Sequence, residues 1–335
     1  MRSDRILLAH GSGGTMMREL IEECIVPDFD DDALKRLDDA ASLPFPGSRV
    51  AFSTDTYVVN PIFFPGGDIG RLAVCGTVND VATSGAKPLY LSVGFVLEEG
   101  FLVEDLRKVL LSMKEASREA GVHIVTGDTK VVEKGHGDGI FINTAGVGVL
   151  PEGMDLSGSY CKPGDVVLVS GTLGDHGIAI ISTREGLSFE TSIETDAAPL
   201  NHLIENVLAA APDTRCFRDP TRGGLSSTLN ELASASGVQI TVREVDCPVK
   251  PQVRGASEML GYDVFQVANE GKMVAVVPPE QAEAALAAMK ASPYGEDAAI
   301  IGEVTEGNGK VYVATAFGAT RIMDMLVGEQ LPRIC

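Results

Sequence analysis

Residues 122–132 read Val122-His123-Ile124-Val125-Thr126-Gly127-Asp128-Thr129-Lys130-Val131-Val132. The β-branched residues at both ends of this stretch are typical of a strand. The tetrad Gly127-Asp128-Thr129-Lys130 predicts a bend that interrupts the strand before it resumes. An aspartate and a lysine at such a bend suit a polar site, although a type I turn containing Asp explains them equally well on local grounds.

The segments on either side of this stretch predict a helix and further strands. An amphipathic helix is expected from Val103 to Ala120, closed by Gly121, and a strand from Ile140 to Leu150. Strands and helices interleave through both halves of the chain. The sequence therefore predicts a mixed α/β (α+β) protein.

The length of 335 residues favours two domains over one. Proline and glycine are concentrated between Pro151 and Pro163, which makes this segment the expected linker. We predict a first, nucleotide-binding domain of residues 1–155, a second α/β domain of residues 156–330, and a tail of residues 331–335.

Composition excludes several classes of partner. The formal net charge of −20 argues against nucleic acid or an anionic membrane, and it means that a bound nucleotide needs a metal ion to mask repulsion. No apolar stretch reaches the ~18 residues of a membrane span. The six cysteines include no CxxC pair, which indicates reduced, cytoplasmic usage.

A glycine-rich turn near the N-terminus reads His10-Gly11-Ser12-Gly13-Gly14-Thr15. It is followed by a segment with helical apolar spacing, so its backbone N–H groups could cradle a phosphate. An ordinary tight turn is the competing interpretation. The turn does not match GxGxxG, and the chain contains no GxxxxGK[ST] motif, so neither a dinucleotide fingerprint nor a P-loop is present.

Four aspartates stand at bends, at ends or in the interior of apolar elements: Asp55, Asp80, Asp128 and Asp219. Each alone is explained by an exposed strand face or a solvated turn. Carboxylates are uncommon inside strands, however, and costly to bury without a partner. Mg²⁺ prefers a few carboxylates together with the phosphates of its substrate. The four aspartates therefore predict ATP bound with Mg²⁺ without a P-loop.

Four motifs resemble the superfamily of aminoimidazole ribonucleotide synthetase, selenophosphate synthetase and thiamine-monophosphate kinase. They are Ser53-Thr54-Asp55, Val78-Asn79-Asp80-Val81, Gly127-Asp128-Thr129-Lys130 and Asp219-x-Thr-x-Gly-Gly. Each motif is weak alone, but in this order they span most of the chain. The start, His10-Gly-Ser-Gly-Gly, and the end, Pro332-Arg333-Ile334-Cys335, resemble one family in this group, the [NiFe]-hydrogenase maturation factors that make cyanide ligands.

The resemblance implies a two-domain aminoimidazole ribonucleotide synthetase-like fold with a flexible C-terminal tail and a homodimer formed through the first halves. It implies ATP and Mg²⁺ as cofactors, with the four aspartates as metal ligands. The implied cofactor-binding residues are Gly11, Ser12, Gly13, Gly14, Asp55, Asn79, Asp80, Asp128, Thr129, Lys130 and Asp219.

The implied activity is that of an ATP-dependent carbamoyl dehydratase. The carbamoyltransferase HypF loads the Cys335 thiol, the S-carboxamide is dehydrated to an S-thiocyanate, and the cyanide passes to iron on the HypC–HypD scaffold. Glu270, in Asn-Glu-Gly-Lys, is the expected general base, although a solvated turn residue is the default for a glutamate there. Lys130 is expected to steady charge on the phosphoryl group or the carboxamide.

The tail is expected to extend rather than to finish a helix, because Pro332 restricts its own backbone and that of its neighbour. From Pro332 to Cys335 its reach is roughly 10–13 Å, enough to carry a sulfur into a cleft. Arg333 either docks the tail on an acidic surface or phosphate, or stays solvated. A frayed terminus with an incidental thiol is the alternative.

Two other functions stay open from the sequence. The first is a sibling ATP-dependent kinase or synthetase acting on a free small molecule, of the selenophosphate or thiamine-monophosphate type. The second is a nucleotide-regulated binding protein whose cysteine only docks a partner. Turnover of a small substrate by a Cys335→Ala variant would favour the first, and ATP that is bound but never cleaved would favour the second.

Overall fold

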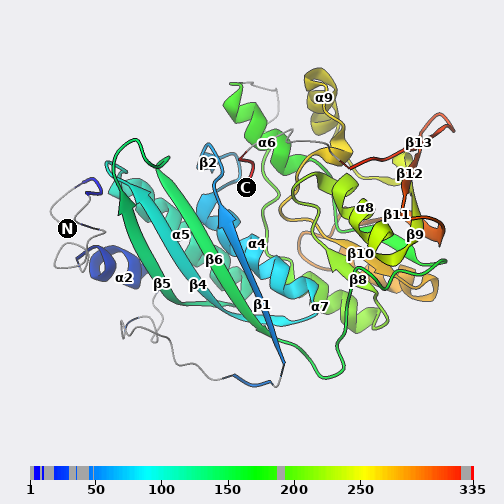
Figure 1. Ribbon diagram of the computed structural model, residues 1–335, viewed down its shortest axis with the longest axis horizontal. Coiled ribbons are helices and arrows are strands. Elements are labelled where there is room, and N and C mark those ends of the chain that lie inside the picture. The colour runs from blue at the N-terminus through cyan, green and yellow to red at the C-terminus, as the bar shows by residue number, and fades with distance from the viewer. Residues whose placement is uncertain are drawn as a thin grey trace.

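The computed structural model describes residues 4–7, 10, 19–29, 35, 45–47, 49–186, 193–325 and 333–335 (Figure 1). These residues form a mixed α/β protein with one main sheet in each half of the chain, as predicted. None of the helices in these residues combines the length and apolarity that a membrane crossing requires.

The first half is built on a four-stranded sheet with strand order β1-β6-β4-β5. Strands β4 and β5 are parallel, and the other neighbours are antiparallel. Its elements in chain order are η2 (Ile21–Ile25), α2 (Val26–Phe29), β1 (Val50–Tyr57), β2 (Phe63–Phe64), β3 (Gly67–Asp68), α4 (Ile69–Thr83), β4 (Lys87–Glu98), α5 (Val103–Ala120), β5 (His123–Val132) and β6 (Ile140–Val149).

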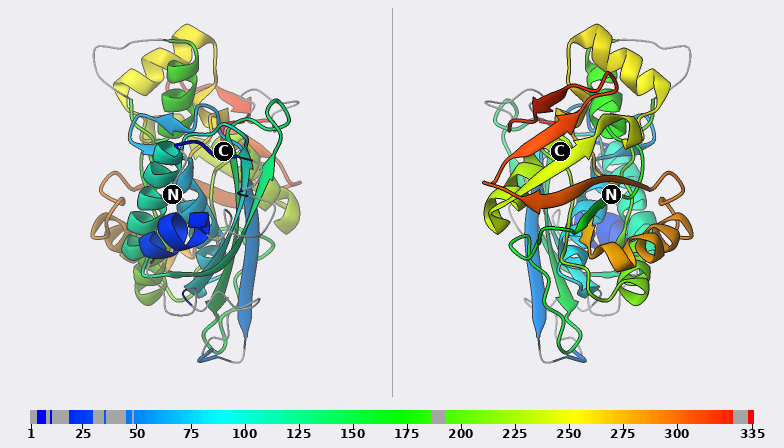
Figure 2. Two further views of the ribbon diagram at one scale, coloured as in Figure 1. Left: turned by 90° about the vertical axis from the view of Figure 1, so that its left-hand side faces the viewer. Right: turned by 90° about the vertical axis from the view of Figure 1, so that its right-hand side faces the viewer.

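Helices α4 and α5 cover one face of this sheet, and their apolar residues form a core with the inward side chains of the strands (Figure 2). Helix α5 is amphipathic and ends at Gly121, whose φ of 70° suits glycine, so the predicted helix is confirmed. The opposite face of the sheet carries large exposed apolar side chains, among them Val50 and Phe52, which is 68% exposed.

Helix α4 lies between the two halves of the molecule. Asp68 caps its N-terminus by accepting hydrogen bonds from the N–H groups of Gly70 and Arg71. Almost every residue of the helix is buried, because one side packs on the first sheet and the other packs against α7 of the second half. A helix that is apolar all round is expected in such a sandwiched position.

The predicted bend at Gly127-Asp128-Thr129-Lys130 is wrong. Strand β5 continues through the tetrad, and Gly127 to Lys130 stay in register with Val93 to Val96 of β4. A side chain at position 127 would lie 2.2 Å from the Val93 carbonyl oxygen. The glycine is therefore needed for close approach of two strands rather than for a turn.

The second half is built on a seven-stranded sheet with strand order β13-β12-β9-β11-β7-β10-β8. Alternate residues of β7 and β10 enter two separate apolar cores, so the middle of this sheet is buried on both faces. Its elements are β7 (Val166–Val169), α6 (Asp175–Arg184), α7 (Asn201–Ala210), β8 (Cys216–Arg218), α8 (Gly224–Ser236), β9 (Val238–Arg243), η3 (Glu244–Asp246), α9 (Pro251–Leu260), η4 (Val264–Gln266), β10 (Val274–Val277), η5 (Pro279–Gln281), α10 (Ala282–Lys290), β11 (Ala299–Glu306), β12 (Val311–Ala314) and β13 (Thr320–Ile322).

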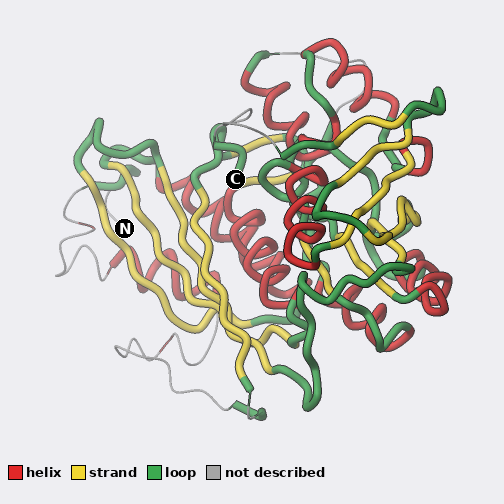
Figure 3. Tube along the Cα trace, turned by 45° about the vertical axis from the view of Figure 1, so that its right-hand side comes forward, coloured by secondary structure: helices red, strands yellow, loops and turns green. Residues whose placement is uncertain are grey.

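The last three residues return to the boundary between the two halves (Figure 3). The N–H groups of Val58 and Asn60 donate hydrogen bonds to the carbonyls of Cys335 and Arg333, at 3.0 and 3.3 Å. Ile334 is buried in an apolar core to which both halves contribute residues. Arg333 forms an ion pair with Asp138, which corresponds to the docked alternative of the two that the sequence left open.

Candidate active site

Three of the four predicted aspartates gather where the two halves meet. Asp55 lies on β1, Asp80 on α4, and Asp219 directly after β8. The Ser53 hydroxyl donates a hydrogen bond of 2.9 Å to the Asp80 carboxylate, which ties α4 to β1. Burial, followed by the charge of Asp219, raises the pKa of Asp80 to about 7. Burial also raises the pKa of Asp219, and the charge of Asp55 adds to that shift.

These carboxylates repel one another, and a divalent cation would relieve that repulsion. Among the residues that the structure describes, no three His, Cys, Asp or Glu side chains form a finished metal cluster. The three aspartates offer the hard carboxylate oxygens that Mg²⁺ takes together with phosphate and water.

Glu270 is buried beside this cluster, with an exposed fraction of only 3%. Its Oε1 atom has no hydrogen-bond partner among the described residues. Burial, reinforced by the charge of Asp196, raises the pKa of Glu270 well above its ordinary value. A carboxylate whose pKa is raised in this way is a stronger base than a solvated glutamate.

The backbone of Glu270 is held from both halves of the protein. Its N–H group donates to Asp196 Oδ1 at 3.0 Å, and its carbonyl accepts a hydrogen bond from Asn79 Nδ2 at 3.3 Å. Asn269 accepts from the Gly174 N–H and donates to the Pro220 carbonyl, which places Glu270 next to the Asp219 segment.

The Cys335 thiol shares this environment. Burial, followed by the negative charge of Glu270, raises the pKa of the thiol, and the positive charge of Arg222 opposes the shift. Glu270 belongs to the second half of the chain. From the first half, the Val58 N–H group donates a hydrogen bond to the carbonyl of Cys335. The terminal sulfur, a buried carboxyl group and the three aspartates thus form one site.

Asp128 and Lys130 do not join this site within one chain. Asp55 pairs with Thr144 across β1 and β6, Thr144 pairs with Val93 of β4, and Val93 pairs with Gly127 of β5. Three strand spacings of about 4.8 Å separate the two edges by ~14 Å. Asp128 and Lys130 are both about 60% exposed and form an ion pair of 2.8 Å with each other.

Two other predicted residues, Thr129 and Asn79, are buried. Thr129 is buried on the side of β5 opposite Asp128, as the alternation of a strand requires. Asn79 is 1% exposed; besides its bond to Glu270, it donates to the Ala198 carbonyl and accepts from the Leu200 N–H. It therefore links α4 to the second half. The predicted phosphate-binding residues Gly11, Ser12, Gly13 and Gly14 lie outside the described residues.

Three residues outside the predicted set also contact or lie near this site: Asp196, His176 and Arg222. Asp196 holds the Glu270 backbone and lies 3.3 Å from the Lys272 ammonium group. His176 contacts the tail, and Arg222 lies close enough to influence the Cys335 thiol. Arg222 occupies an unspecified position of the Asp219 motif, and His176 is a titratable residue between glycines at a helix start. These two positions are the sequence features by which Arg222 and His176 can be recognised as candidates.

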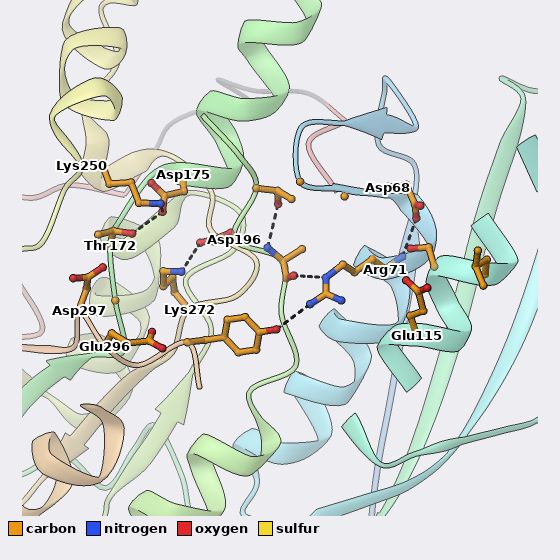
Figure 4. Close-up of a pocket in the computed structure, with 18 of the residues that line it drawn as sticks. Asp68, Arg71, Glu115, Thr172, Asp175, Asp196, Lys250, Lys272, Glu296 and Asp297 are labelled. Atoms are coloured by element: carbon orange, nitrogen blue, oxygen red, sulfur yellow. Dashed lines mark hydrogen bonds and ion pairs between the residues drawn. The ribbon is translucent and has the colours of Figure 1, made fainter. Parts of the chain in front are cut away.

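A cavity of about 660 Å³ lies between α4 and α5 on one side and the second half on the other (Figure 4). The Asp196–Lys272 ion pair forms part of its wall. Arg71 crosses it and donates hydrogen bonds to the Ala197 carbonyl at 2.8 Å and to the Tyr294 hydroxyl at 3.4 Å. These contacts fix residues 196–197 and, through Asp196, the backbone of Glu270.

The pKa of Asp80 leads to a testable stability difference in metal-free protein. An aspartate whose pKa is raised on folding contributes stability below its ordinary pKa of 3.8, and this contribution is lost as the pH rises through about 7. Asparagine does not titrate but can still accept the Ser53 bond. In EDTA, Asp80→Asn should therefore gain stability relative to the native protein between pH 5 and pH 8, by ~2 kcal/mol after discounting for solvent screening. Thermal unfolding measures this difference. Asp297→Asn, at an exposed position, serves as the control and should show no such trend.

Comparison with known proteins places the chain in a family. Residues 37–150 match the N-terminal domain, and residues 162–314 the C-terminal domain, of AIR synthase related protein. The carbamoyl dehydratase HypE of Azotobacter vinelandii is 53% identical over 336 residues, covering 100% of this chain and 98% of that relative.

Two solved structures extend the comparison. The crystal structure of hydrogenase maturation protein HypE in complex with ATP matches with a TM-score of 0.95 and 49% identity, covering 98% of this chain and 99% of that one. A chain of the HypE–HypF complex matches with a TM-score of 0.81 and 52% identity, covering 92% of this chain and 99% of that one.

The motif-based resemblance is thus confirmed over the whole chain rather than at isolated segments. This favours the maturation-factor family over the sibling kinases and synthetases. The chain belongs to the AIR synthase related family and, within it, to the carbamoyl dehydratases of the HypE type.

Proposed function

We propose that this protein dehydrates an S-carboxamide on its own Cys335 to an S-thiocyanate at the expense of ATP, for the maturation of [NiFe] hydrogenases. The observation that carries the proposal is the terminal thiol, which lies beside the buried carboxyl of Glu270 and the aspartates. A relative solved with ATP and another solved with HypF support the nucleotide and the carbamoyl donor.

The reaction requires activation of a poor leaving group. The amide oxygen attacks the γ-phosphorus of ATP, the bond between the β- and γ-phosphoryl groups breaks, and ADP leaves. The C–O bond then breaks with phosphate as the leaving group, while both N–H protons are lost and the carbon–nitrogen triple bond forms. The net change is S-carboxamide plus ATP to S-thiocyanate, ADP and phosphate.

Glu270 is the proposed base for the N–H protons. Its unpartnered oxygen is available, and its elevated pKa brings the group closer to the working pH, where base catalysis is most effective. The bonds from Asp196 and Asn79 to its backbone hold it in place. Burial of Ile334 behind the thiol excludes water that would otherwise hydrolyse the activated carboxamide.

Asp55, Asp80 and Asp219 are the proposed ligands of Mg²⁺, which when bound neutralises charge on the transferring phosphoryl group. The three carboxylates of these residues lie close together. The other proposed contacts to the nucleotide are Asp128, Ser12 and the glycine residues 11, 13 and 14.

A homodimer would bring Asp128 and Lys130, which share the exposed face of β5, to this chemistry. Strand β5 is an edge strand, and the sheet face bearing Lys130 also bears exposed apolar residues such as Phe52. Exposed apolar surface of this kind is typical of an interface. We propose that two copies associate through their first halves, so that Lys130 of one subunit serves the Cys335 site of the other.

Mixing two inactive variants tests this arrangement. Lys130→Ala and Glu270→Gln chains should each be at least ~10²-fold slower than native protein. After denaturation and joint refolding, heterodimers contain one site with both native residues, so activity should return to about a quarter of the native level.

No recovery in that mixture would mean that Lys130 acts within its own chain or not at all. A mixture of Glu270→Gln with Cys335→Ala is the matched control, because both residues belong to the site of one chain. It should stay inactive.

The tail must also leave the site to meet other proteins. We propose that the C-terminal tail alternates between the docked position of residues 333–335 and one accessible to HypF and to the HypC–HypD scaffold, in the cytoplasm. The boundary between the two domains, at residues 155–156, is likewise a prediction.

Incubation with HypF, carbamoyl phosphate and ATP, followed by mass spectrometry of the C-terminal peptide, tests the function: a carbamoyl adduct should appear on Cys335 and convert to a cyano adduct.

A further inference from the structure

The backbone around Cys335 is anchored from both halves of the protein. From the first half, the Val58 N–H group donates to the carbonyl of Cys335 itself at 3.0 Å. From the second half, His176 Nε2 lies 2.8 Å from the carbonyl oxygen of Ile334, the residue before it. With the carbonyls on both sides of the Cys335 α-carbon held, the direction of its Cα–Cβ bond is held as well, which leaves the sulfur only the staggered positions about that bond.

The hydrogen bonds around His176 define its tautomer. Its Nδ1 atom lies 2.7 Å from the Thr195 hydroxyl oxygen, which already accepts the N–H of Ala197. The hydroxyl proton is therefore free to point at Nδ1, which leaves the ring proton on Nε2. A neutral imidazole with its proton on Nε2 is the form that can donate to the Ile334 carbonyl.

The ring itself is held rigidly. His176 has no exposed surface, and the Phe64 ring meets it edge to face at a centroid distance of 5.7 Å. Burial lowers the pKa of His176, which keeps the ring neutral. Phe64 belongs to the first half and His176 to α6 of the second, so the imidazole lies at the contact between the two halves.

We propose that His176 is a positioning residue for the reaction: its Nε2–H group holds the Ile334 carbonyl and thereby aims the Cys335 sulfur at Glu270. The effect of this hydrogen bond on catalysis rests on the proposed function, whereas its effect on the position of the tail does not. The other hydrogen bonds described for the tail involve Arg333, two residues before the thiol, and join it to Arg184, Asn60, Val58 and Asp138. They hold the tail in its groove without fixing the sulfur.

The experiment compares three substitutions at one position. His176→Leu keeps the bulk and removes the donor. His176→Asn keeps polarity but is too short to reach the carbonyl, and His176→Gln restores a donor at about the distance of Nε2. His202→Leu, at an exposed histidine of α7, is the matched control.

The first readout is the rate at which iodoacetamide alkylates Cys335 in the resting protein, measured on the C-terminal peptide. A docked thiol reacts slowly, because burial raises its pKa, so labelling reports the undocked tail. Loss of one buried hydrogen bond should raise the rate about 5- to 30-fold in His176→Leu and His176→Asn, with a near-native rate in His176→Gln and His202→Leu.

The second readout is single-turnover conversion of the carbamoylated protein to the cyano form, which should slow in the same two variants and recover in His176→Gln. Unchanged labelling in His176→Asn, or equally fast labelling in His176→Gln and His176→Leu, would overturn the proposal. Labelling does not depend on turnover. A native protein that makes no cyano product would therefore refute the proposed function while leaving the role of His176 to be read from alkylation.

Discussion

Replacement of Cys335 by alanine will abolish both the carbamoyl and the cyano adduct and leave ATP binding close to its native level. The thiol is the only nucleophile of the tail, and it lies beside Glu270 at the meeting point of the two halves. The other five cysteines are buried, so none can take over the carbamoyl group without unfolding. Mass spectrometry of the intact protein after incubation with HypF, carbamoyl phosphate and ATP measures the adducts, and the ATP-induced rise in melting temperature measures binding.

Cys247→Ala is the matched control for this prediction. Cys247 is 5% exposed and lies in the second half, away from the tail, so its replacement should leave the adducts on Cys335 intact. A Cys335→Ala protein that still consumed ATP with a free small substrate would revive the kinase or synthetase alternative.

Replacement of Glu270 by glutamine should stop the reaction between its two steps. The variant is expected to accept the carbamoyl group from HypF at a near-native rate, because that step takes place on the departed tail. Conversion to the cyano form should slow by ~10²–10⁴, the usual contribution of a positioned base. A time course of the two adducts measures the rates separately. A normal rate of conversion would remove Glu270 from the proposed role.

The same substitution should stabilise the protein at neutral and alkaline pH. A carboxyl group whose pKa rises on folding contributes stability below its ordinary pKa of 4.5, and this contribution is lost as the pH rises through the elevated value. Glutamine carries no charge to bury. Without nucleotide and metal, Glu270→Gln should therefore melt at a higher temperature than native protein, by a margin that grows from pH 5 upward. Glu296→Gln, at an exposed position, should show no such margin.

The helices and strands of this protein could largely be predicted from local sequence. The helix from Val103 to Ala120 was predicted to the residue, because its apolar periodicity and Gly121 are properties of neighbouring positions. The identity of the family was equally accessible, since its motifs are short contiguous runs. The bend at Gly127 was predicted wrongly because glycine marks both turns and close strand contacts. Only the pairing with β4 distinguishes the two.

The sequence by itself determined which side chains are the candidates for the chemistry: Cys335, Glu270 and the aspartates are all readable from motifs. Tertiary structure alone decided which of them meet. It brought Asp55, Asp80 and Asp219 to Glu270, moved Asp128 and Lys130 to the far edge of the sheet, and made Asn79 and His176 supports for reacting groups. The reason is physical: neighbours across a sheet or between domains are set by strand order and long-range packing, which no local run of residues encodes.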